Sequence, residues 1–162
     1  MARLPLPLAL VGVLLLAGCA STVSLEAAPN SNDPDCAQVS VHLPDEIEGQ
    51  AKQYTDAQAT AAWGSPVSVI LRCGMDVPAA SPLPCFDKGG VFWLRDASTA
   101  PNYVFTTFGR DPAISVAVDA DLMDPGIALE TLTDTVLYTP ENGRQCTSLE
   151  DTVTGSTPLP AG

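Results

Sequence analysis

The chain has 162 residues and carries 19 acidic against 7 basic side chains, which gives a formal net charge of −12. This excess of acid leaves no basic surface to neutralise phosphates, so the composition argues against nucleic acid as a partner. The hydrophobic fraction of 46% is too high for a disordered chain. We therefore expect a folded protein with a single domain.

The first residues have the pattern of an export signal. Arg3 precedes an apolar run over residues 4–17, which ends at Gly18 and Cys19. A bilayer-spanning helix needs about 20 apolar residues, whereas the apolar region of a signal peptide needs about 7 to 15. We predict a signal peptide over residues 1–18.

The end of this run carries a more specific motif. Leu16-Ala17-Gly18-Cys19 resembles the lipobox of bacterial lipoproteins. In that family the cysteine thiol receives a diacylglyceryl group, and the chain is then cleaved immediately before the cysteine. The resemblance implies lipidation of Cys19, which would anchor the protein to the outer face of the cytoplasmic membrane. The alternative is an ordinary signal peptide with a chance cysteine.

The rest of the chain divides by composition. Residues 19–35 are mostly small and polar with two prolines, which predicts a flexible tether after the lipidated cysteine. Residues 147–162 have the same character and predict a flexible C-terminal tail. One folded domain is expected between them, over residues 36–146.

Four further cysteines predict two disulfides, because an even number in an exported chain is typical of disulfide bonding. They are Cys36, Cys73, Cys85 and Cys146. Three pairings are possible, and we favour Cys36 with Cys146 and Cys73 with Cys85. The chain has no CxxC spacing and a single histidine, so neither a metal nor another cofactor is expected.

Four segments are predicted as β-strands, the first from its alternation of buried-type and other residues and the other three as β-branched and aromatic runs. They cover residues 67–73, 90–95, 103–108 and 113–118. Turn residues separate the last three, which predicts an antiparallel meander.

Two segments are candidates for helices. Residues 127–137 place Leu129, Leu132 and Val136 on one helical face, after Asp124 as N-cap. Residues 35–43 are ambiguous between a short helix and a strand. The predicted fold class is α+β, with an antiparallel sheet of about four strands packed by one or two helices and two disulfides.

The sequence contains no catalytic motif. His42 is the one candidate base, and no nucleophile-elbow pattern accompanies it. We predict that the protein is not an enzyme.

Two scarce cations are candidate ligand-binding residues. Arg72 on a strand and Arg110 in a turn could each pair with a carboxylate of the chain, or together bind an anionic ligand.

A weak alternative is a calcium site. Asp119, Asp121 and Glu130 match positions 1, 3 and 12 of a calcium-binding loop. Met123 and Asp124 occupy the fifth and sixth positions, where an oxygen ligand and a glycine belong.

Several blocks together resemble an actinobacterial family of small lipoproteins that carry a domain of unknown function. The blocks are Cys36, Leu43-Pro44, Trp63-Gly64-Ser65-Pro66, Leu71-Arg72-Cys73-Gly74, Cys85, Gly90-Val91-Phe92-Trp93, Thr107-Phe108-Gly109-Arg110-Asp111-Pro112 and Cys146. The resemblance implies a cell-envelope protein of a high-GC Gram-positive bacterium, but no activity and no catalytic residues.

These observations predict an exported, lipid-anchored binding or interaction module at the outer face of the cytoplasmic membrane. Its expected partners are the membrane, through Cys19, and a cell-wall component or a membrane protein. The alternative is an envelope enzyme that uses two facing carboxylates.

The lipid anchor makes the first testable prediction. Replacing Cys19 with Ala removes the thiol that would be acylated, so the variant should be released or remain unprocessed. Partitioning between detergent and aqueous phases measures this, and unchanged recovery in the detergent phase contradicts the anchor.

Overall fold

A computed structural model describes residues 22–147. Eight strands form one antiparallel sheet in the order β1-β2-β3-β4-β8-β7-β6-β5. In chain order the elements are α1 (Pro34–Val41), β1 (Glu46–Ile47), β2 (Gln50–Gln53), β3 (Thr60–Trp63), β4 (Val69–Met75), β5 (Cys85–Lys88), β6 (Val91–Thr99), β7 (Asn102–Phe108), β8 (Ala113–Asp119) and α2 (Pro125–Val136). The predicted signal peptide, Cys19 and residues 148–162 of the predicted tail lie outside the described residues.

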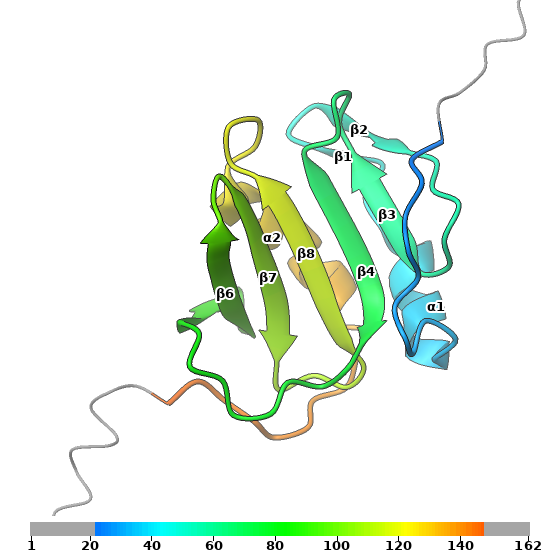
Figure 1. The fold of residues 1–162 in the computed structure, drawn as a ribbon. Helices are drawn as coiled ribbons and strands as arrows, with labels where there is room; N and C mark the ends of the chain where they lie inside the picture. The colour runs from blue at the N-terminus through cyan, green and yellow to red at the C-terminus, as the bar shows by residue number, and fades with distance from the viewer. Residues whose placement is uncertain (1–21, 148–162) are drawn as a thin grey trace, which may run out of the picture.

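The sheet consists of two meanders. Strands β1 to β4 and β5 to β8 each pair with their neighbours in sequence, and the two sets join where β4 pairs with β8. Figure 1 shows α2 behind this sheet and α1 beside β4. Helix α2 contacts β8 and also β1 and β5 at the two edges. The sheet therefore curves around α2.

The core lies between the inner face of the sheet and α2. Leu71 pairs with Val116, and Val116 pairs with Phe105, so three strands contribute one apolar row on this face. These three side chains are at most 3% exposed, and Leu129 and Leu132 of α2 are equally buried. Burial of side chains of this size stabilises the fold by about 1.5 to 3 kcal/mol each.

Both helices begin at an aspartate cap. The Asp124 carboxylate accepts a hydrogen bond from the Ile127 N–H at 3.1 Å, and Pro125 occupies the first helical position. The helix predicted for residues 127–137 is thereby confirmed, with its apolar face buried. At α1 the Asp33 carboxylate accepts from the Asp35 N–H at 2.8 Å, and the ambiguous segment 35–43 is helical as far as Val41.

The α+β class is confirmed, but the predicted number of about four strands is wrong. The four predicted segments correspond to β4, β6, β7 and β8, and the last three form the expected meander. Strands β1, β2, β3 and β5 contain two to four residues each. Such strands are too short to show an alternation of burial in the sequence.

Two disulfides are present, but the favoured pairing is wrong. The bonds join Cys36 to Cys73 and Cys85 to Cys146. Cys73 lies on β4 and Cys85 on β5, and three strands separate these two in the sheet. Strands are spaced by about 4.8 Å, so the sheet holds Cys73 and Cys85 much further apart than a disulfide can span.

The predicted tether of residues 19–35 is also corrected, because residues 22–35 belong to the fold. The Val23 N–H donates to the Tyr54 carbonyl at 2.8 Å, and the Asn30 N–H donates to the Gly74 carbonyl at 2.8 Å. Gly74 has a φ of +97°, and a Cβ at this position would collide with the Asn30 backbone. The segment is thus packed closely across β4.

The two disulfides should differ in their effect on stability. Cys36 and Cys73 are fully buried and close a 37-residue separation, so their joint replacement by Ala should lower the free energy of unfolding by about 4 kcal/mol. The pair Cys85 and Cys146 is the matched control. Its separation of 61 residues gives it a similar loop-entropy effect, but both of its cysteines are half-buried, so their replacement leaves no core cavity and should cost less in total. Urea denaturation measures both values, and equal losses would contradict this assignment.

Candidate functional site

Arg110, one of the two predicted ligand-binding cations, holds the fold together. Its side chain is buried, and its guanidinium donates to the Thr139 carbonyl at 2.6 Å and to the Glu141 carboxylate at 3.2 Å. These contacts join the turn between β7 and β8 to the segment that follows α2. A buried charge needs such partners, so this side chain is committed to the structure.

Arg72 lies elsewhere. It is on the outer face of β4, opposite the core, and is half-buried between Thr60 and Ser115 of the neighbouring strands. None of the ion pairs among residues 22–147 involves it. The structure therefore does not bring Arg72 and Arg110 into one anion site.

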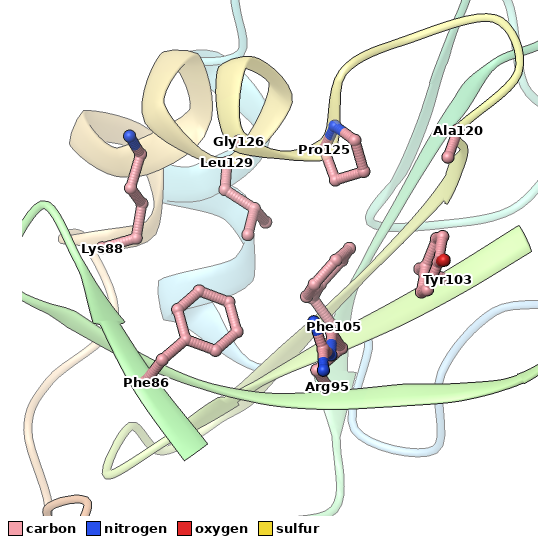
Figure 2. A pocket seen from close by; sticks show the side chains of 9 residues that line it. All are labelled: Phe86, Lys88, Arg95, Tyr103, Phe105, Ala120, Pro125, Gly126 and Leu129. Atoms are coloured by element: carbon pink, nitrogen blue, oxygen red, sulfur yellow. The ribbon is translucent and has the colours of Figure 1, made fainter. Parts of the chain in front are cut away.

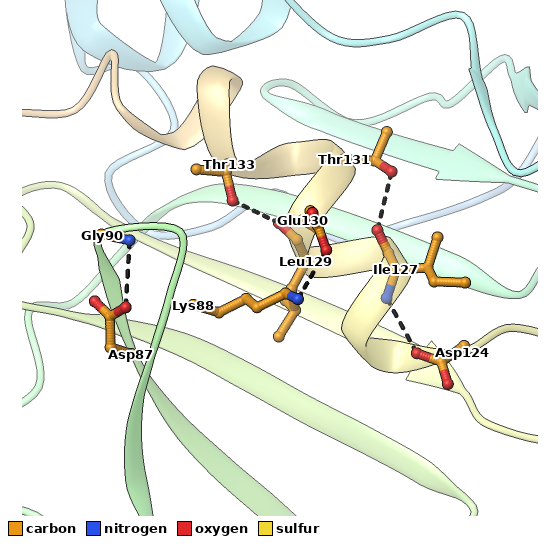
Figure 3. A network of polar contacts seen from close by, with 9 residues as sticks. All are labelled: Asp87, Lys88, Gly90, Asp124, Ile127, Leu129, Glu130, Thr131 and Thr133. Carbon is orange, nitrogen blue, oxygen red and sulfur yellow. Dashed lines mark hydrogen bonds and ion pairs between the residues drawn. The ribbon is translucent and has the colours of Figure 1, made fainter.

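The carboxylates of the alternative calcium site also bond to different partners. The Asp119 carboxylate accepts from the Asp121 N–H at 3.0 Å, which closes the turn before α2. Glu130 pairs instead with Lys88, and its carboxylate lies 2.8 Å from the Lys88 ammonium (Figure 3). Within residues 22–147 no group of three side chains suited to metal binding is found. The structure gives no support to a calcium loop here.

A pocket lies between the inner face of β5, β6 and β7 and the first turn of α2 (Figure 2). Its volume of about 440 Å³ falls in the range of small-molecule sites. The lining residues are Phe86, Lys88, Arg95, Tyr103, Phe105, Ala120, Pro125, Gly126 and Leu129. We refer to it as the α2 pocket.

The walls of the α2 pocket are apolar and aromatic. Phe86 and Phe105 meet edge to face, with ring centroids 6.1 Å apart, and Tyr103 lies 6.4 Å from Phe105. Leu129 forms the wall on the side of α2. Because Phe105 is buried by the core, these walls are held in place before any ligand arrives.

The charge of the α2 pocket is opposite to that of the protein. Two of the seven basic residues of the chain, Lys88 and Arg95, line it, and none of its lining residues is acidic. Lys88 is paired with Glu130. Arg95 is exposed and takes part in none of the ion pairs of the described chain. The positive end of α2, at Pro125 and Gly126, faces the same space.

The sequence contained a signal for this site that our reasoning missed. Phe86-x-Lys88 and Trp93-x-Arg95 each place an aromatic and a cation two residues apart. Residues at this spacing face the same side of a strand, and Phe86 pairs with Trp93 in the sheet. Recognising β5 as a strand would have brought both cations to one surface.

His42, the candidate base of the sequence analysis, has its contacts outside the α2 pocket. The ring of His42 stacks on Tyr138 at 3.8 Å, and its Nδ1 lies 2.7 Å from the Gln38 carbonyl oxygen. Neither His42 nor any carboxylate lines the α2 pocket. The pocket thus offers shape, apolar surface and positive charge.

The structural role of Arg110 predicts a measurable difference from Arg72. Replacing Arg110 with Ala leaves the buried Thr139 carbonyl without its donor, so the free energy of unfolding should fall by about 1 to 3 kcal/mol. Arg72→Ala is the matched control and should change it by less than about 1 kcal/mol. Urea denaturation of both variants checks this, and equal effects contradict the assignment.

Among the described residues, no helix is both long and apolar enough to span a membrane.

Comparison with known proteins places the chain in a family. No curated protein and no solved structure matches the chain. A family model described as a protein of unknown function, DUF3515, matches residues 4–143 and so covers most of the sequence. The predicted resemblance is thereby confirmed as far as a domain of unknown function, and the chain belongs to the DUF3515 family.

Proposed function

We propose that the protein is an exported lipoprotein that binds a small amphipathic anion in the α2 pocket. Cys19 would anchor it at the outer face of the cytoplasmic membrane. The ligand would have an apolar or aromatic body and one anionic group, either as a free molecule or as a protruding part of a cell-wall component.

Three observations support the location. The apolar run and the lipobox-like residues precede Cys19, and the family match begins at residue 4, within that run. The fold contains two disulfides, which persist in oxidising compartments outside the cytoplasm. An export signal followed by a lipidated cysteine accounts for these features together.

The observation that carries the binding role is the exposed Arg95 at an apolar pocket without carboxylates. Three arginines of the described chain, Arg72, Arg95 and Arg144, take part in no ion pair, and Arg95 is the one of them that lines the α2 pocket. Its guanidinium can hold a carboxylate, sulfonate or phosphate through two parallel hydrogen bonds. The described structure therefore supports a binding role, and it places no pair of carboxylates at this pocket for the alternative of an envelope enzyme.

The apolar walls and Arg95 should contribute unequally to the free energy of binding. Covering about 200 Å² of apolar ligand surface contributes about 5 kcal/mol. An ion pair at a partly exposed arginine contributes about 0.2 to 1 kcal/mol. Affinity should therefore come mainly from the walls, while Arg95 selects ligands with an anionic end.

A fluorescent probe with this chemistry tests the proposal. Anilinonaphthalene sulfonate has an aromatic body and one sulfonate, and N-phenylnaphthylamine is its uncharged counterpart. The mature chain from Ala20, exported so that its disulfides form, should bind both. Arg95→Gln should weaken binding of the sulfonate about fivefold and leave the uncharged probe unaffected.

Lys52→Gln is the matched control, because Lys52 is a surface cation on β2 that pairs with Asp45 outside the α2 pocket. It should bind both probes like the unchanged protein. Circular dichroism confirms that each variant is folded. The proposal fails if the folded protein binds neither probe, or if Arg95→Gln binds the sulfonate as tightly as Lys52→Gln does.

A further inference from the structure

We propose that the turn between β2 and β3, which begins with Tyr54, is the surface of the domain that contacts the membrane. This inference rests on the proposed lipid anchor at Cys19. It commits to one partner, the headgroup layer of the bilayer that holds the acyl chains.

The described chain enters the fold at this turn. The Val23 N–H donates to the Tyr54 carbonyl at 2.8 Å, and the Asp56 N–H donates to the Val23 carbonyl at 3.3 Å. Val23 thereby forms a parallel bridge with Thr55. The N-terminal segment is thus fixed to the turn by backbone hydrogen bonds on both sides of Thr55, next to Tyr54.

Further contacts keep the segment in place. The Leu25 N–H donates to the Asp56 carboxylate at 2.8 Å. This hydrogen bond, together with one from Ser24, lowers the pKa of Asp56, so the carboxylate is charged at neutral pH and remains an acceptor. Further along, the Asn30 N–H bonds the Gly74 carbonyl. The entry point of the chain is therefore a fixed position on the domain.

The chain between the predicted anchor at Cys19 and the first fixed residue, Val23, is short. Four peptide steps separate Cys19 from Val23, and a fully extended chain spans at most about 14 Å over that distance. A domain of the described length is about 35 Å across. The link is too short for the domain to turn its opposite edge to the membrane, so the β2–β3 turn stays close to the headgroups.

The side chain at the start of the turn suits a place at the membrane surface. Tyr54 is 74% exposed. Tyrosine is enriched at membrane–water interfaces, where its ring meets apolar surface and its hydroxyl stays hydrated. Asp56 lies two residues after Tyr54, and Glu26 follows Leu25, which donates to Asp56. These carboxylates resist deeper burial. The ring is therefore assigned to the headgroup layer and not to the acyl chains.

The same geometry determines on which side of the domain, relative to the membrane, the α2 pocket lies. In Figure 1 the blue start of the described chain lies on the side of β2 and β3, and the orange end lies on the side of β6. The pocket is lined by β5, β6 and β7, at the other end of the strand order from β1 and β2. With the β2–β3 turn at the bilayer, these strands lie on the side of the domain away from it.

Fluorescence quenching by headgroup-labelled lipids tests the contact. The full chain, acylated in a bacterial host, is reconstituted into phosphatidylcholine vesicles with or without a nitroxide quencher on the lipid headgroup. Tyr54→Trp adds a fluorophore at the turn, while Trp63 and Trp93 are fully buried and give a constant background. The matched control is Leu83→Trp, an exposed position in the loop before β5. The nitroxide should remove about half of the emission added at residue 54 and little of that added at residue 83.

A third variant tests the length of the link. About twelve Gly and Ser residues inserted between Ala20 and Ser21 extend the mean reach by about 20 Å. Quenching at residue 54 should then fall to the level seen at residue 83. The insertion lies outside the described fold, so folding should be unaffected.

The outcomes separate this inference from the proposed function. Equal quenching at residues 54 and 83 in an acylated protein overturns the orientation and leaves the anchor intact. A mass spectrum of the mature protein without acyl groups on Cys19 overturns the anchor and the orientation together.

Discussion

The ladder between β4 and β8 is the interaction on which the rest of the structure depends. It is the single place where the two meanders pair, and its inner side chains, which include Leu71 and Val116, are almost fully buried. Its two strands are far apart in sequence, so closing the ladder orders a long stretch of chain. Once it has formed, the inner face is continuous and wide enough to curve around α2.

Several features act by supporting this ladder. The Cys36–Cys73 bond ties α1 to β4, and Asn30 crosses the end of the same strand at Gly74. On the other side β8 leads through a short turn to the Asp124 cap of α2. The first turn of α2 is thereby aimed at β5 to β7, and the α2 pocket is the space left between them. The pair Lys88–Glu130 also bridges β5 and α2, but its side chains are 35% and 71% exposed, so it contributes little stability.

The parts of the fold that could be predicted are those with a strong local cause. Strand β4 alternates apolar and polar residues, β6, β7 and β8 contain runs of β-branched and aromatic residues, and α2 has an aspartate cap followed by proline. The edge strands could not be predicted, since residues such as Gln50–Gln53 have no apolar pattern and pair only because a neighbour offers hydrogen bonds. The disulfide pairing failed for the same reason, because it follows from the strand order. The candidate site depended on β5, so Arg95 was overlooked, while Arg110 was chosen for its scarcity and proved to be structural.

The charge of the protein narrows the class of ligand that the α2 pocket can hold. With a formal net charge of −12, the chain as a whole repels anions at long range. At physiological ionic strength this repulsion is screened beyond about 8 Å, so attraction must come from groups within the pocket. Arg95 alone is too weak to hold a small inorganic ion, because a partly exposed ion pair contributes about 1 kcal/mol or less. A ligand that also covers Phe86, Phe105 and Leu129 gains several times more from apolar contact, so the pocket favours amphipathic anions over simple ones.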